Sequence, residues 1–398
     1  MKARLLDMGM VSPLRSQSIY HAVTQCMGPD SDLAVTLMRP SKPCVSVGFF
    51  QEAEREVDLA YCEASRIPVL RRHVGGGAVL LDMYQLFFHV ILPSAKAAEF
   101  GLPPRFADRF AYLAQPPIAA YRKLGVAAEF WFFNDIHVRG RKIGGTGLGE
   151  IGEGLVFAGS MMMDFDTRRM ARVLKIPDEK MRDKVSERLD EYMTTLAREL
   201  GAKPEVAPVA EALMGAFEEA FDLDLVPSAL TPAELEAVGD WDGILTDPEW
   251  LHQVGLKQTG TRTVKISENV RVLHAESKAP GGMMRLTVTA LNGHIAEMLL
   301  SGDFPVSPQG ALCDFTRAFE GVSLGRGRGD VHGVPVCPSQ GPRFVAKSPA
   351  AGAYAAQELP NGWRGNASGG APAGDRERGR LEPGDASRAG ALCVPIVH

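Results

Sequence analysis

Cysteine, long apolar runs and an excess of charge of one sign are all scarce in this chain. The 398 residues include six cysteines, none in a CxxC pair, which indicates neither a disulfide framework nor a zinc site. No uninterrupted apolar run approaches the roughly 20 residues that a membrane-spanning helix needs, and the first residues, MKARLLDMGMVSP, lack the apolar core of a signal peptide. The formal net charge of −5 gives no general attraction to nucleic acid. We therefore expect a cytoplasmic protein that binds neither nucleic acid nor membranes.

Length and periodicity predict two folded domains followed by a tail. In residues 1–226, short β-prone runs are interspersed with helical patterns, which predicts an α+β domain: a mixed sheet with flanking helices. Residues 227–324 predict a small α/β accessory domain. It opens with the capping-box spacing Thr231-Pro232-Ala233-Glu234 and contains a hairpin at Asn292-Gly293. Within these two domains we expect, among other elements, a helix at 16–26, a broken helix at 105–124, a hairpin at 127–138, a helix at 189–200 and a strand at 264–276.

Residues 325–398 have a different composition. These last 74 residues hold 14 of the 42 glycines, with many prolines, arginines and alanines and little apolar periodicity. Such a composition cannot bury enough surface to offset its ordering entropy, so we expect disorder. The segment is either a genuine low-complexity tail or the product of a reading-frame shift, and we assign it no chemistry.

The stretch Arg71-Arg72-His73-Val74-Gly75-Gly76-Gly77 is the first candidate for a ligand site. Three consecutive glycines are costly to order, and here they lie between two apolar runs, which is typical of a close approach between backbone and another group. The two arginines upstream add donors suited to phosphate or carboxylate. A glycine-rich β-bulge with two solvated arginines explains the stretch equally well.

A second stretch, Asn134-Asp135-Ile136-His137-Val138-Arg139-Gly140-Arg141-Lys142-Ile143-Gly144, adds a basic pair and another glycine cluster. Together the two stretches resemble the motifs of the lipoate–protein ligase A family, within the biotin/lipoyl protein ligases: Arg-Arg-x-x-Gly-Gly-Gly-Ala-Val, then Asn-Asp, then Arg-Lys-x-x-Gly. Weaker similarity extends from about residue 15 to about residue 324. The Ser301-Gly302-Asp303-Phe304 run is similar to the usual sequence of that family's accessory domain.

The resemblance implies activation of lipoate with ATP to lipoyl-AMP and transfer of the acyl group to a lysine of a lipoyl domain. The acceptors would be of the 2-oxoacid dehydrogenase E2 or glycine cleavage H type, or a related lipoate-binding protein, and octanoate could replace lipoate. Lys142 would be the catalytic cation, and Asp135 would hold Mg²⁺ with the phosphates. The residues expected to contact the nucleotide are Arg71, Arg72, Gly75, Gly76, Gly77, Ala78, Val79, Leu80, Asn134, Asp135 and Lys142.

Each assignment has a plainer alternative. Lys142 could be a solvated hairpin charge and Asp135 a turn-capping carboxylate. Val74, Phe88 and Phe157 would suit an acyl tunnel, although core packing explains them equally well. Lys184, Ser186 and Arg188 faintly resemble a family pattern, but we favour a helix surface for them.

The run Gly147-Leu148-Gly149-Glu150-Ile151-Gly152 matches the GxGxxG dinucleotide fingerprint. That fingerprint requires a helix opening inside it, and the glycine-broken, β-prone sequence that follows does not predict one. We prefer a mobile loop over the active site.

Departures from the family motifs leave three activities open. Leu81-Asp82 stands where the family usually has His-Asp, and Ala158-Gly159 where it often has His-Gly. The chain could be an ATP-dependent ligase, an octanoyl- or lipoyltransferase acting on a carrier-bound acyl group through a cysteine thioester, or a non-catalytic acyl- or nucleotide-binding protein. The lack of any cysteine between Cys62 and Cys313 argues against the transferase.

Overall fold

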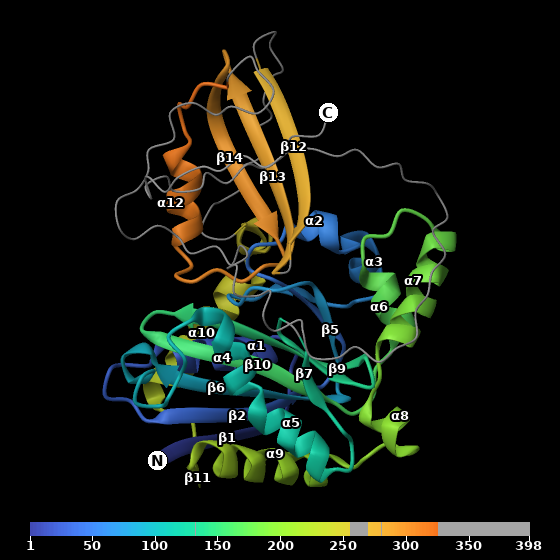
Figure 1. Cartoon of the computed structure of the whole chain (residues 1–398), viewed down its shortest axis with the longest axis vertical. Helices are drawn as coiled ribbons and strands as arrows, with labels where there is room; N and C mark the ends of the chain where they lie inside the picture. The colour runs from blue at the N-terminus through green and yellow to red at the C-terminus, as the bar shows by residue number, and fades with distance from the viewer. Residues whose placement is uncertain (132, 255–269, 280, 325–398) are drawn as a thin grey trace, which may run out of the picture.

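The computed structural model describes residues 1–131, 133–254, 270–279 and 281–324, and it confirms the α+β architecture (Figure 1). An eight-stranded sheet in the order β11-β1-β2-β6-β10-β9-β8-β7 forms the centre. It is mixed, because β1 runs parallel to β2 and β11 while the other neighbours are antiparallel. Its strands are β1 (Lys2–Val11), β2 (Leu33–Pro40), β6 (Gln85–Pro93), β7 (Glu129–Trp131), β8 (Asp135–Val138), β9 (Arg141–Ile151), β10 (Gly154–Met162) and β11 (Asp224–Pro227).

Helices cover both faces of this sheet, so its central strands are buried on both sides. β2 shows the alternation: Val35 and Leu37 enter one core, and Ala34 and Met38 the other. The first core contains side chains of α4 (Phe106–Leu113), α5 (Gln115–Lys123) and α9 (Val206–Phe221), and the second those of α1 (Arg15–Gln25) and α10 (Pro232–Thr246). The expected break in the 105–124 helix is confirmed, since α5 starts with prolines in its first turn.

A small second sheet, in the order β4-β3-β5, carries the three-glycine turn. Its strands are β3 (Cys44–Val47), β4 (Val69–Arg71) and β5 (Val79–Leu81), with α2 (Ala53–Glu56), α3 (Leu59–Ala64) and α6 (Thr167–Val173) packed against it. The turn connects β4 to β5. Because both strands pair with β3, the two ends of the turn are fixed by backbone hydrogen bonds.

The accessory module stands at one end of the molecule, at the top of Figure 1. It consists of β12 (Val270–Ala279), β13 (Gly282–Leu291) and β14 (His294–Gly302), covered on one face by α12 (Ala311–Ala318). The hairpin at Asn292-Gly293 is confirmed, with φ of 53° and 80° at the two residues, the left-handed values that a two-residue hairpin turn of this kind requires.

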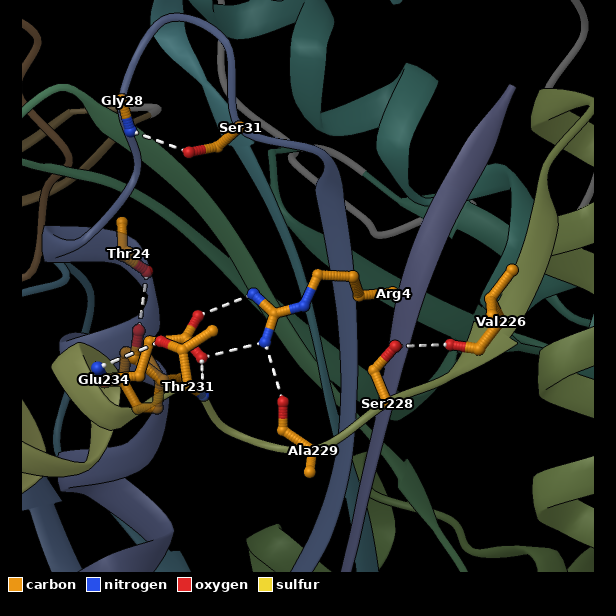
Figure 2. A network of polar contacts seen from close by, with 10 residues as sticks. Arg4, Thr24, Gly28, Ser31, Val226, Ser228, Ala229, Thr231 and Glu234 are labelled. Carbon is orange, nitrogen blue, oxygen red and sulfur yellow. Dashed lines mark hydrogen bonds and ion pairs between the residues drawn. The ribbon is translucent and has the colours of Figure 1, made fainter.

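Helix α10 packs with the main sheet rather than with the accessory module. Val238 and Trp241 lie in the core that α1 covers. Figure 2 shows Arg4 of β1 donating to both carboxylate oxygens of Glu234, at 2.7 and 2.8 Å. The expected capping box is confirmed, because Thr231 and Glu234 exchange side-chain to backbone hydrogen bonds. We therefore propose that the domain boundary lies between α11 (Pro248–His252) and β12, and not at residue 227.

Two expectations about local structure are wrong. The 189–200 segment is not one helix: α7 (Glu179–Tyr192) ends within it, and α8 (Leu196–Leu200) begins after an extended Met193 that bridges to Lys142. Residues 147–151 form part of strand β9, not a mobile loop, which also confirms that GxGxxG is no dinucleotide fingerprint here. The tail at 325–398 and residues 264–269 of the expected strand lie outside the described residues. No helix in the described ranges is both long and apolar enough to cross a membrane.

Candidate active site

The turn between β4 and β5, here called the glycine loop (residues 72–78), is closed on itself by one arginine. Arg72 donates from Nη1 to the carbonyl of Ser46 at 2.8 Å, and from Nη2 to the carbonyls of Gly75 and Gly77 at 2.9 and 2.8 Å. Burial lowers the pKa of Arg72 to about 10, so the group stays charged at neutral pH. Gly76 has a φ of +98°, which only glycine adopts without strain. The loop therefore has a defined shape.

Arg71 anchors the same loop to its surroundings. The residue is fully buried, and its guanidinium donates to the carbonyls of Gly48, Phe49 and Leu251 at 2.8, 3.1 and 2.7 Å. Desolvation lowers the pKa of Arg71 to about 10. Both arginines thus donate to main-chain carbonyls. We therefore propose that the two guanidinium groups shape the loop, and their contact with a nucleotide stays a prediction.

Alternate glycines of β9 leave room on one face of the strand, two of them for the glycine loop and one for the side chain of Lys142. A Cβ at Gly147 would lie 2.9 Å from Val74 Cγ1, and one at Gly149 would lie 3.1 Å from Val74 Cγ2. A Cβ at Gly145 would lie 3.2 Å from Lys142 Nζ. Residues i and i+2 of a strand project from the same face, about 7 Å apart. The amine of Lys142 and the glycine loop therefore share one face of β9, over neighbouring positions of that face.

Lys142 is held at the start of β9 by an ion pair and by its backbone. Its Nζ lies 2.7 Å from Asp135 Oδ1, and its carbonyl accepts a hydrogen bond from Thr194 N at 2.8 Å. The other oxygen of Asp135 accepts from Tyr192 at 3.3 Å. The Lys142 side chain is 27% exposed, so the ammonium can reach a ligand. A positioned cation of this kind suits charge that develops on phosphate and carbonyl oxygens.

Asn134 fixes the turn that presents Asp135. Its Nδ2 donates to the carbonyl of Thr146 at 2.6 Å, and its own carbonyl accepts from Thr146 N and Oγ1, both at 2.8 Å. This exchange joins the β7–β8 turn to β9 beside Gly145 and Gly147. Asn134 therefore acts in this structure by positioning its neighbour.

Asp135 fits a magnesium ion only in company with phosphate. Within the described ranges, no cluster of three or more His, Cys, Asp or Glu side chains could hold a metal. Mg²⁺ is commonly bound through one or two carboxylates together with substrate phosphates and water. Asp135 can supply one such carboxylate once Lys142 turns to a substrate, so the residues present fit this mode.

Several expected site residues belong to the cores. Phe88 and Phe157 are fully buried with Phe217 of α9, on the face opposite to the glycine loop, so core packing explains them. Leu80 is also a core side chain, which leaves only its backbone for a ligand. Val74 is the side chain of the glycine loop that packs on β9. The weak candidates are on helix α7, as we favoured: Lys184 and Arg188 are exposed and Ser186 is half-buried.

The segment that follows β14 covers the glycine loop, a contact that the sequence did not reveal. A Cβ at Gly75 would lie 3.1 Å from the carbonyl oxygen of Phe304. Gln309 donates to the carbonyl of His73 at 2.8 Å, and Ser307 donates to Glu150 at 2.9 Å. The accessory module thus reaches the site through residues 304–309. The only sequence signal was the Ser301–Phe304 run, which lies at the start of this contact.

Comparison with known proteins shows the family to which this chain belongs. Residues 12–218, just over half of the chain, match the family model of the lipoyl protein ligase A/B catalytic domain. The chain belongs to this family. It is similar to the octanoyltransferase LipM of Kyrpidia tusciae, with 26% identity over 52% of this chain and 82% of the relative. It is also similar to lipoate-protein ligase A subunit 1 of Thermoplasma acidophilum, with 29% identity over 48% of this chain and 73% of the relative.

Solved structures of lipoate ligases share the fold. The bi-partite lipoate protein ligase of Thermoplasma acidophilum superimposes with a TM-score of 0.59 and 25% identity, covering 65% of this chain and all of that one. A lipoate-protein ligase A bound with ATP gives a TM-score of 0.55 at 23% identity, covering 63% of this chain and 99% of that one, a likeness that shows the fold alone. The protein is therefore an enzyme of the lipoate ligase and octanoyltransferase family.

Proposed function

We propose that this protein activates lipoate with ATP to lipoyl-AMP and then transfers the lipoyl group to a lysine of an acceptor lipoyl domain. The observation that carries the proposal is the shared face of β9, on which Gly145 lies against the Lys142 ammonium, and Gly147 and Gly149 lie against Val74 of the glycine loop. Backbone N–H groups of a glycine-rich turn and a lysine together suit an adenylate, whose phosphate and carbonyl oxygens lie close to each other.

The chemistry has two steps that balance without a further reactant. First, a lipoate carboxylate oxygen bonds to the α-phosphorus of ATP, and the bond to the β-phosphate breaks with its electron pair on pyrophosphate. Next, the neutral amine of the acceptor bonds to the acyl carbon, the bond to AMP breaks with its electron pair on the phosphate, and the nitrogen loses a proton to water. Lys142 stabilises the negative charge that both steps place on oxygen. Mg²⁺, with Asp135 as its protein ligand, would neutralise the phosphates.

The described cysteines support the ligase over a thioester-forming transferase. The attacking species in such a transferase is the thiolate. Burial raises the pKa of Cys44 to about 12 and that of Cys62 to about 11, and it also raises the pKa of Cys26. These three thiols are therefore protonated at neutral pH. Cys313 lies on α12 of the accessory module, half-buried.

A second candidate is an octanoyltransferase, because the curated relatives from Kyrpidia tusciae and Moorella thermoacetica bear that name at 26% and 24% identity. Such an enzyme would take the acyl group from a carrier and would need no ATP. The transferase requires a thiol within reach of Lys142, whereas the ligase requires none, so the two candidates differ in their chemistry.

ATP–pyrophosphate exchange in the presence of lipoate tests the proposal. We expect exchange by the wild-type protein and a loss of about 10²- to 10³-fold in Lys142→Ala, the usual cost of removing one preorganised transition-state contact. Lys180→Ala, at an exposed lysine of α7, is the matched control and should exchange normally. Octanoyl transfer from a carrier protein, without ATP and without any exchange, would instead establish the transferase.

A further inference from the structure

Two exposed aromatic side chains lie beside the Lys142–Asp135 pair. Trp131 on β7 is 48% exposed, and Tyr192 at the end of α7 is 46% exposed. Trp131 is the direct partner of Asp135 in the β7–β8 register, so the two side chains share a face. Tyr192 donates to Asp135 Oδ2 at 3.3 Å. Aromatic rings from two elements therefore border one carboxylate.

A buried histidine holds Trp131 in place from below. The His137 ring stacks on Trp131 with centroids 4.9 Å apart and planes at 8°, and it meets Tyr192 edge-on at 5.7 Å. His137 is 1% exposed, and its register partner is Lys142. Because its ring is supported on one side, Trp131 offers a rigid surface on which a ligand can pack with little loss of side-chain entropy.

The Asp135 carboxylate can accept a further hydrogen bond. Asp135 Oδ1 is taken by Lys142, while Oδ2 points toward Tyr192 and lies 3.8 Å from His137 Nε2, too far for a hydrogen bond. The Asp135 side chain is 15% exposed, and a carboxylate oxygen can accept more than one hydrogen bond, so a polar guest that packs on the neighbouring rings can reach it.

We propose that Trp131, Tyr192 and Asp135 receive the side chain of the acceptor lysine before it is acylated. The inference rests on the proposed function and names where the acceptor enters. An ammonium group is attracted to aromatic faces and to a carboxylate, and the methylene stem of a lysine packs against rings. Asp135 already binds one lysine ammonium, that of Lys142, so its surroundings accept this chemical group. Asp135 would serve Mg²⁺ in the first step and the guest amine in the second, after pyrophosphate has left, and the guest amine would then stand across this carboxylate from Lys142.

The test compares the two substrates of the two steps. With an acceptor lipoyl domain, ATP and lipoate, we expect Trp131→Ala and Tyr192→Ala each to raise the KM for the acceptor by about tenfold, equivalent to one lost contact of about 1.4 kcal/mol. The KM for lipoate in pyrophosphate exchange should not change, and Trp131→Phe should keep most of the acceptor affinity because it keeps a ring. Met181→Ala is the control: it is 50% exposed on the same helix, about 16 Å along the axis from Tyr192, and should change neither KM.

Three results would overturn the inference. An unchanged acceptor KM in Tyr192→Ala and Trp131→Ala would mean that the acceptor does not touch these rings. A raised KM for lipoate in the exchange assay would place the acyl chain there instead. An equal effect of Met181→Ala would show that any exposed apolar group matters. If the wild-type protein catalyses no pyrophosphate exchange at all, the proposed function itself is wrong. That result is distinct from the three above, because it requires no variant.

Discussion

Replacing Gly48 by alanine tests whether the glycine loop needs its observed position. An added Cβ would lie 1.8 Å from the carbonyl oxygen of Gly76, whereas an ordinary contact is at least 3.4 Å. The opposing atom belongs to the backbone, so no side-chain rotation relieves the clash, and the loop must move by about 1.6 Å. Displacements of about 1 Å in a binding element can reduce an enzymatic rate by about 10²-fold. We expect Gly48→Ala to lose exchange activity on at least this scale.

The same variant should keep most of its stability although it loses most of its exchange activity. Overpacking of this kind costs about 1–3 kcal/mol, which leaves a domain of this size folded. Urea denaturation measures that loss, and pyrophosphate exchange measures the activity. Gly239→Ala is the control, because this helical glycine of α10 has open space around its Cβ and alanine favours helix. Full exchange activity in Gly48→Ala would refute the assignment of the loop to the active site.

Three further predictions concern single side chains. Lys142→Arg should show as little exchange as Lys142→Ala, because the branched guanidinium cannot place one compact charge between two oxygens. Wild-type exchange activity in Lys142→Arg would contradict this. Arg71→Met should lower the free energy of unfolding by about 2 kcal/mol or more, measured in urea, since three buried carbonyls lose their donor. His89, whose pKa burial lowers from 6.5 to about 3, stays neutral in the folded protein while the unfolded chain takes up a proton. Stability should therefore fall by up to about 1.4 kcal/mol per pH unit as the pH drops below 6.5 toward 3, and urea midpoints of His89→Gln should fall less steeply.

Local patterns predicted much of the fold because the decisive interactions lie close in sequence. The Asn292-Gly293 turn, the capping box of Thr231 and the proline break before Ile118 depend on neighbours within a few residues, and all are confirmed. The domain to which α10 belongs depends instead on the contact between Arg4 and Glu234, which are 230 positions apart. The periodicity of a helix does not predict which core that helix covers.

The candidate site could also be predicted only in part from local sequence patterns. The motifs brought Lys142 and the three glycines into one hypothesis, and in the structure Val74, beside those glycines, packs on the face of β9 that also carries the Lys142 amine. The motif could not show that the forks of Arg71 and Arg72 face carbonyls, because a guanidinium suits a carbonyl or a phosphate equally well. Tyr192 carried no signal at all, since its partner lies 57 residues upstream. The alternation of Gly145, Gly147 and Gly149 was the signal missed: a period of two glycines indicates a strand face that another segment covers.

The most direct measurement is the intact mass of an acceptor lipoyl domain after incubation with the purified protein, lipoate and ATP. The account predicts that the acceptor gains one lipoyl group on its lysine, that the gain requires ATP, and that Lys142→Ala lowers its initial rate by about 10²- to 10³-fold. Acylation of the acceptor that proceeds without ATP, or at an unchanged rate in Lys142→Ala, would contradict the claim that this lysine and the glycine loop together hold an acyl-adenylate.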